Sequence, residues 1–198
     1  MKRKRSPLPL CLAGLALCGL LLAAAWQVRM HHSAQKSRET ARQLQTLLPE
    51  RTPGAAVEFL DPRMPALEID GTDYVGLLEI PAFGVGLPIE DGWKGGTRTS
   101  AVRRFWGSAY DRALVVGGPD HPGQFDFCDD IDIGTPVTVT DMTGVQFSYI
   151  VSWVDRAKRA DARWLTESGH ALTLFCWDAY ALEYVAVRCD SASGQPGI

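Results

Sequence analysis

From about residue 74 onward, apolar residues occur in short runs separated by Gly, Pro and Asp. This is the pattern of a protein built from short β-strands. The segments "YVGLLEIP" (74–81) and "VGLPIE" (85–90) each predict a strand, with a turn between them at Phe83–Gly84. The segment "ALVVGG" (113–118) is apolar without alternation, which is typical of a strand buried on both faces.

The second half of this region predicts a hairpin and two further strands. In "TPVTVTDMTGVQFSYIVSWVD" (135–155), apolar and polar residues alternate on both sides of a turn over residues 141–144. The segments "ALTLFC" (171–176) and "EYVAVRC" (183–189) predict the last two strands. Seven or eight short strands at this spacing predict an all-β fold, a closed barrel rather than an α/β sheet.

The N-terminal part has a different pattern. Ser6 to Val28 carry no charged side chain, and Leu8 to Ala25 are almost all apolar. Such a run is long enough for a helix to cross a hydrocarbon core of about 30 Å. Four basic residues precede it, which predicts a single-pass anchor in the cell membrane with the C-terminal body outside the cytoplasm. The alternative is a cleaved signal peptide, because "LAAAW" places small residues before Trp26.

The pattern divides the chain into four segments. Residues 1–28 are predicted to be a cytoplasmic basic end and membrane anchor. Residues 29–72 are predicted to be a helical stalk and a proline-containing linker, with Leu44, Leu47 and Leu48 on one side of the helix. The β-barrel is predicted over residues 73–190, and residues 191–198 form a C-terminal tail.

Charge excludes one class of partner. The formal net charge is −3, but four of the positive charges lie at residues 2–5. The rest of the chain sums to −7, with 16 Lys and Arg against 23 Asp and Glu. An acidic body argues against nucleic acid as a partner.

The cysteines do not form a regular framework. Of the five, Cys128, Cys176 and Cys189 lie in the body, and an odd number cannot pair fully within one chain. A disulfide from Cys176 to Cys128 or Cys189 stays as an alternative to a buried thiol. No Cys–His spacing resembles a zinc site. Acidic residues gather at 129–132, but the sequence predicts no metal and no other cofactor.

Several segments, in order, resemble the sortases. They run from about residue 74 to 189 without a large insertion: "YVGLLEIPAFGVGLPI", "WGSAY", "ALVVGG", "GTPVTVTDMTGVQFSYIV" and "LTLF…VRC". The resemblance implies an eight-stranded β-barrel and a membrane-anchored cysteine transpeptidase of the bacterial cell envelope. In that family a Cys attacks the Thr–Gly bond of an LPxTG-like sorting signal, an Arg stabilises the oxyanion, and a His acts as acid and base.

Residue by residue, the resemblance places other residue types at all three catalytic positions. Pro119 stands at the His position, Trp177 at the Cys position and Tyr184 at the Arg position. Proline has no titratable group, and a tyrosine hydroxyl donates a neutral hydrogen bond that is weaker than one from a guanidinium. We interpret Trp177 as a side chain that fills the nucleophile's pocket. Arg188 belongs to the family-like "VRC" stretch and is not interpreted as a replacement.

Two neighbouring residues keep open the alternative that the chemistry has moved. Cys176 lies one residue before Trp177, and His121 lies two residues after Pro119. A shift of one residue on a strand turns the side chain to the other face, so Cys176 is predicted to face away from the groove unless a bulge intervenes. A thiol also needs a base or a cation to lower its pKa. We interpret His121 as a solvated loop residue.

The sequence therefore predicts a membrane-anchored, sortase-like protein that no longer catalyses transpeptidation and binds instead. Its predicted partners, besides the membrane, are a sorting-signal peptide, a surface or pilin protein, or an active sortase. The alternative function is a divergent, active cysteine transpeptidase that cleaves an LPxTG-like signal with Cys176 and His121. A third alternative is a degenerate protein with no retained role.

Overall fold

A computed structural model describes residue 18 and residues 35–53, 61–94 and 99–192. The predicted membrane anchor lies outside the described residues apart from Cys18, as does most of the predicted tail. Within the described ranges, no helix has the length and apolar character needed to cross a membrane.

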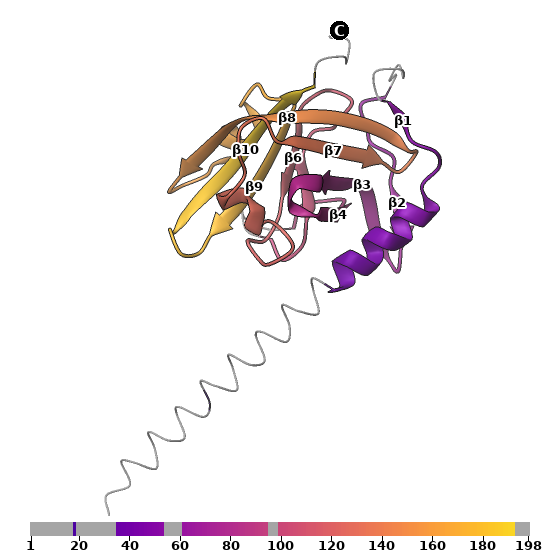
Figure 1. Cartoon of the computed structure of the whole chain (residues 1–198), viewed down its shortest axis with the longest axis horizontal. Coiled ribbons are helices and arrows are strands. Elements are labelled where there is room, and N and C mark those ends of the chain that lie inside the picture. Colours follow the sequence, from indigo (N-terminus) through magenta and orange to yellow (C-terminus); the bar gives the residue numbers. More distant parts are fainter. Residues whose placement is uncertain (1–17, 19–34, 54–60, 95–98, 193–198) are drawn as a thin grey trace, which may run out of the picture.

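The described part of the chain consists mainly of short strands (Figure 1). These are β1 (Thr52–Pro53), β2 (Leu67–Ile69), β3 (Thr72–Ile80), β4 (Val85–Glu90), β5 (Arg103–Trp106), β6 (Leu114–Gly117), β7 (Pro136–Asp141), β8 (Val145–Ala157), β9 (Leu172–Asp178) and β10 (Glu183–Ser191). The helical elements are an α-helix over residues 35–47, the short 3-10 helices η2 (Pro81–Phe83) and η3 (Asp126–Asp129), and the short α-helix α2 (Ala162–Thr166).

Eight of the strands close into a barrel. Hydrogen bonding follows the order β3–β4–β5–β6–β9–β10–β8, and β7 pairs with both β8 and β3 to complete the ring. The neighbours β4–β5 and β6–β9 are parallel, and the other pairs of the ring are antiparallel. β2 adds to one end of β3, and β1 adds to the start of β8. The predicted all-β closed barrel is confirmed.

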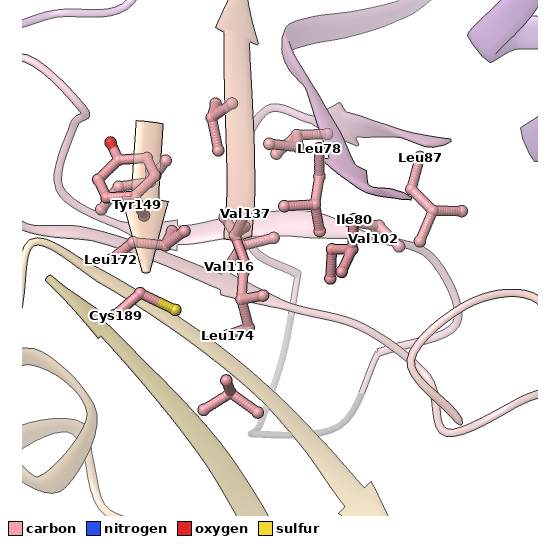
Figure 2. Close-up of a cluster of buried hydrophobic side chains, with 14 of the residues drawn as sticks. Leu78, Ile80, Leu87, Val102, Val116, Val137, Tyr149, Leu172, Leu174 and Cys189 are labelled. Carbon is pink, nitrogen blue, oxygen red and sulfur yellow. The ribbon is translucent and has the colours of Figure 1, made fainter. Parts of the chain in front are cut away.

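The barrel interior holds the alternating apolar residues of these strands. The predicted inward residues of the β7–β8 hairpin, Val137 and Val139 on one strand and Tyr149 and Val151 on the other, are buried. They pack in one core with side chains from the other strands of the barrel (Figure 2), which include Leu78, Ile80, Leu87, Val116, Leu172, Leu174 and Cys189. Burial of this apolar surface drives closure of the ring.

The helix over residues 35–47 lies along the barrel beside β2 and β3 (Figure 1). It buries Thr40, Ala41 and Leu44, and the Thr40 hydroxyl is hydrogen-bonded to the Tyr74 hydroxyl on β3. Leu47, predicted to share a face with Leu44, is 63% exposed. The helix thus contacts the barrel through the face that carries Thr40, Ala41 and Leu44, which are positions i, i+1 and i+4.

The sequence pattern does not predict β5. This four-residue strand carries two arginines and pairs with β4 through Glu90 and Arg103. Arg103 forms an ion pair with Glu90, and Arg104 forms one with Asp91 at 2.6 Å. Charge pairing, rather than apolar alternation, therefore holds the junction between β4 and β5.

Candidate functional site

Three adjacent strands bring the positions that the sequence resemblance assigns to catalysis to one end of the barrel. β6 and β9 are parallel, with Gly117 opposite Phe175, and the Gly118 amide donates to the Phe175 carbonyl at 3.0 Å. Pro119 and Trp177 each follow that pair by two residues, at the carboxyl ends of neighbouring strands. β10 runs antiparallel to β9 and places Tyr184 directly opposite Trp177. The "ALVVGG" and "LTLF" segments are therefore neighbouring strands.

Two of the three residues at these positions, Trp177 and Tyr184, pack against each other. The rings of Trp177 and Tyr184 meet edge to face, with centroids 4.6 Å apart. Tyr184 and Pro119 are buried, and Trp177 is half-buried. Such an aromatic pair contributes apolar contact and leaves part of the indole surface available to a ligand.

Cys176 faces the barrel interior. Its side chain is 2% exposed and belongs to the main apolar core, where it neighbours the thiol of Cys128 on η3. The β9–β10 pairing is regular through Cys176 and Val185, so no bulge turns the thiol outward. Cys176 therefore points away from Trp177, as strand alternation predicts.

His121 lies in the turn that follows β6. Its amide donates to the Pro119 carbonyl at 2.9 Å, and its own carbonyl accepts from the Gln124 amide at 2.9 Å. Nδ1 of the half-buried imidazole donates to the Asp120 carbonyl at 2.5 Å. The backbone of the turn thus orients this ring.

An aromatic cluster covers the outer face of β6 and β9 next to Trp177. It consists of Trp93, Phe105 and Phe175, whose ring centroids lie 5.1 to 5.5 Å apart. The cluster lies against the backbone of Gly117, where an added Cβ would come within 2.6 Å of both Trp93 and Phe175. Glycine at this position lets the rings approach the strand directly.

Comparison with solved structures identifies the fold. Sortase C1 from Streptococcus agalactiae matches with a TM-score of 0.52 and 22% identity, over 66% of this chain and 72% of that one. Sortase A from Corynebacterium diphtheriae matches with a TM-score of 0.52 and 16% identity, over 89% and 98%. Sortase C-1 from Actinomyces oris matches with a TM-score of 0.50 and 21% identity, over 80% and 98%. The chain has the sortase fold. Scans of protein-family models and of curated proteins gave no match.

In this sortase fold, Arg188 serves a structural purpose away from Tyr184. Arg188 pairs with Thr173 and Tyr184 with Trp177, so four residues of strand, about 13 Å, separate the two. The buried guanidinium donates to the Trp164 carbonyl at 2.8 Å and lies 4.8 Å from the centre of the Trp164 ring. Burial lowers the pKa of Arg188. Arg188 therefore fastens α2 to the barrel wall.

Acidic residues surround this end of the sortase barrel. Burial, assisted by the charges of Asp129 and Asp178, raises the pKa of Asp120. Arg156 balances part of this charge through ion pairs with Asp129 at 3.0 Å, Glu183 at 3.2 Å and Asp178 at 3.8 Å. The acidic run at 129–132 thus supplies an ion-pair partner, and within the described ranges no group of His, Cys, Asp or Glu is arranged to hold a metal.

Sequence reasoning missed one feature of the site and left a second one open. The aromatic cluster combines residues from β5, β9 and the segment after β4, so no local pattern reveals it; the only hint is Trp93 within the glycine-rich stretch "DGWKGG". The contact between Cys128 and Cys176 was only one of several alternatives, because their spacing in the chain does not fix their distance.

Proposed function

We propose that this protein is a membrane-anchored sortase-family protein of the bacterial cell envelope that has lost transpeptidation. In place of catalysis it binds a sorting-signal peptide, a surface or pilin protein, or an active sortase. One observation carries the proposal: the adjacent strands β6, β9 and β10 bring together Pro119, Trp177 and Tyr184, and these residues supply no thiol, imidazole or guanidinium.

The chemistry of transpeptidation needs groups that these residues lack. A thiolate must attack the scissile carbonyl, and an indole cannot do so. Proline neither accepts nor donates a proton through its side chain, and tyrosine offers only a neutral donor to an oxyanion. Loss of one such group commonly lowers the rate by orders of magnitude, although groups that act as a unit are not additive.

The location of Cys176 weighs against relocated catalysis. A displaced nucleophile would need contact with a peptide carbonyl and with a base that lowers its pKa. Cys176 instead faces another thiol, that of Cys128, inside the apolar core. Burial raises the pKa of Cys128, which marks this surrounding as unfavourable to thiolates.

The same site favours binding of an apolar peptide segment. Trp177 is half-buried against Tyr184, so its ring is held in place at little further entropic cost. By the sortase resemblance the Thr–Gly end of an LPxTG-like signal would lie at position 177, where the threonine methyl group and the glycine backbone can pack on the aromatic face. The proposed ligand therefore matches the surface that replaces the catalytic groups.

The decisive measurement is turnover of fluorogenic sorting-signal peptides by the purified full chain in detergent. We expect neither cleavage nor transfer to an amine above the rate without protein. The control is Cys176→Ala, which should leave that result unchanged. Turnover by the natural protein that Cys176→Ala abolishes would identify Cys176 as a displaced nucleophile and refute the proposal.

Binding is tested separately by fluorescence anisotropy with a labelled sorting-signal peptide. We expect saturable binding, weakened at least about tenfold by Trp177→Ala, since loss of one central aromatic contact costs about 1.4 kcal/mol or more. The matched control is Trp153→Ala, because Trp153 lies on β8 with 57% of its surface exposed. Equal affinity of the two variants, or no binding at all, would contradict a peptide site at Trp177.

A restoration experiment tests the residue assignment itself. The triple change Pro119→His, Trp177→Cys and Tyr184→Arg places all three family groups on one end of the barrel. We expect detectable peptide cleavage from the triple variant and none from Trp177→Cys alone, because an isolated thiol lacks its base and oxyanion donor. Activity of the single variant equal to that of the triple variant would show that the other two positions are wrongly assigned.

A further inference from the structure

Two buried thiols meet inside the barrel. Cys128 on η3 is 1% exposed and Cys176 on β9 is 2% exposed, and both belong to the main apolar core. Both cysteines are free thiols, and they lie close enough to influence each other's ionisation. The chain thus brings together two sulfur atoms from segments 48 positions apart, which neither the fold nor the proposed binding site requires.

The register of the strands excludes Cys189, the third cysteine of the barrel, as a disulfide partner for Cys176. On the β9–β10 ladder, Cys176 lies opposite Val185 and Cys189 lies opposite Leu172. The two cysteines are thus four residues apart along the ladder, about 13 Å. A disulfide requires Cα atoms within about 7 Å. Among the cysteines of the barrel, Cys128 is the one that Cys176 can reach.

We propose that Cys128 and Cys176 form a disulfide when the protein folds in an oxidising compartment. The oxidant is an exchangeable disulfide, either a low-molecular-weight one or that of a thiol oxidoreductase. The thiolate of one cysteine attacks it and releases one thiol; the second cysteine then attacks the mixed disulfide and releases the other. Two thiols of the chain lose two electrons and two protons, and the oxidant gains them as two thiols.

Burial sets the time at which the bond forms. Exchange requires a thiolate and access to the oxidant, and burial raises the pKa of the Cys128 thiol. The folded, reduced protein therefore resists oxidation, and the bond forms before the core closes. Once formed, the disulfide fixes η3 to β9 at the residue before Trp177. It also removes the Cys176 thiol from any chemistry, whether or not the site binds peptide.

The test uses the full chain, unfolded, reduced and then refolded in detergent with or without oxidised glutathione. After denaturation, free thiols are labelled with N-ethylmaleimide and counted by mass spectrometry. We expect five labels without the oxidant, since the chain has five cysteines, and three labels with it. Proteolysis of the oxidised sample should yield one cross-linked peptide pair, containing Cys128 and Cys176. Five labels after oxidative refolding, or a cross-link that involves Cys11, Cys18 or Cys189, would overturn the proposal.

Two variants supply a matched control. Cys189→Ala removes a buried thiol without touching the pair, so it should give two labels and the same cross-linked peptides after oxidation. Cys128→Ala should give four labels with or without oxidant. If either variant fails to fold, the number of labelled thiols on the natural chain still shows whether the disulfide forms. Adding oxidant to the already folded, reduced protein should leave Cys128 and Cys176 free, because both are buried; rapid appearance of the cross-linked Cys128–Cys176 peptides there would refute the timing.

Discussion

Arg188 is a charged side chain held almost entirely inside the protein, and its hydrogen bonds explain how. Its guanidinium donates to the carbonyls of Trp164 and Leu165 and to the Thr173 hydroxyl, and it pairs with Asp155 at 3.5 Å. These partners replace the water that a buried guanidinium loses. The residue thus anchors α2, which crosses the outer face of the barrel.

Removal of the Arg188 side chain should destabilise the folded protein. We expect Arg188→Ala to lower the free energy of unfolding by about 3 kcal/mol, because it leaves buried carbonyls without donors and opens a cavity. Arg163→Ala, on the exposed face of α2, should change it by less than about 0.5 kcal/mol. Urea titration followed by far-ultraviolet circular dichroism measures both. Similar values for the two variants would show that Arg188 does not anchor α2.

The surroundings of Asp120 in the folded protein destabilise its ionised form. Its pKa lies above the ordinary value of 3.8, chiefly because of burial and also because of Asp129 and Asp178. The ionised form is therefore destabilised in the folded state, and this loss of stability develops as the pH rises above 3.8.

The change Asp120→Asn replaces the destabilised carboxylate with a neutral amide. At pH 7 we expect the variant to have a higher free energy of unfolding than the natural chain. At about pH 3, where the carboxyl is protonated in both states, the difference should vanish. Denaturant titrations at several pH values measure this. A difference that stayed constant with pH would attribute the effect to something other than the carboxylate.

At the scale of elements, the aromatic cluster depends on the bare backbone of β6. We expect Gly117→Ala to lower the free energy of unfolding by about 1 to 3 kcal/mol, because its methyl group would overlap Trp93 and Phe175. Gly86→Ala on β4 is the matched control, since an added Cβ there meets nothing within 4 Å. Chemical denaturation compares them. Equal stabilities would mean that the rings rearrange freely around Gly117.

Most elements could be predicted because their strands follow a local rule. β4 matches its predicted bounds, and the β7–β8 hairpin follows the alternation in residues 135–155. β5 could not be predicted, because its pairing with β6 and its charge pairs with Glu90 and Asp91 involve residues from separate segments. The helix over residues 35–47 was expected, but the face it buries depends on contact with β3, which its own sequence does not encode.

The candidate site was predictable only in part, and for the same reason. Strand alternation alone places Cys176 and Trp177 on opposite faces, and the structure agrees. The grouping of Pro119, Trp177 and Tyr184 was predicted from the sortase resemblance and not from a local pattern. Residues 119 and 177 are far apart in the sequence, although the strands that carry them are neighbours in the sheet. What covers the neighbouring face could not be read from the sequence, because Trp93 and Phe105 reach it through tertiary packing.

At the scale of the whole molecule, the proposed membrane anchor predicts where the protein is found. We expect the full chain to fractionate with membranes, and residues after Gln27 to be accessible to protease added from outside. Deletion of residues 8–25 should abolish membrane association. Recovery of a mature form that begins at Trp26 would instead establish cleavage of a signal peptide.

The parallel pairing of β6 with β9 also dictates the order in which the molecule assembles. Trp177 and Tyr184 belong to one hairpin, whereas Leu114 and its partner Leu172 are 58 positions apart. Hairpins form in about 1–10 μs, but long-range pairings of this kind take milliseconds to seconds. Pulsed hydrogen exchange during refolding should therefore protect amides between β9 and β10 before those between β6 and β9. Until the β6–β9 pairing forms, the edge of β6 stays open to pairing with other chains, so a pairing that closes the barrel is also a place where misassembly can begin.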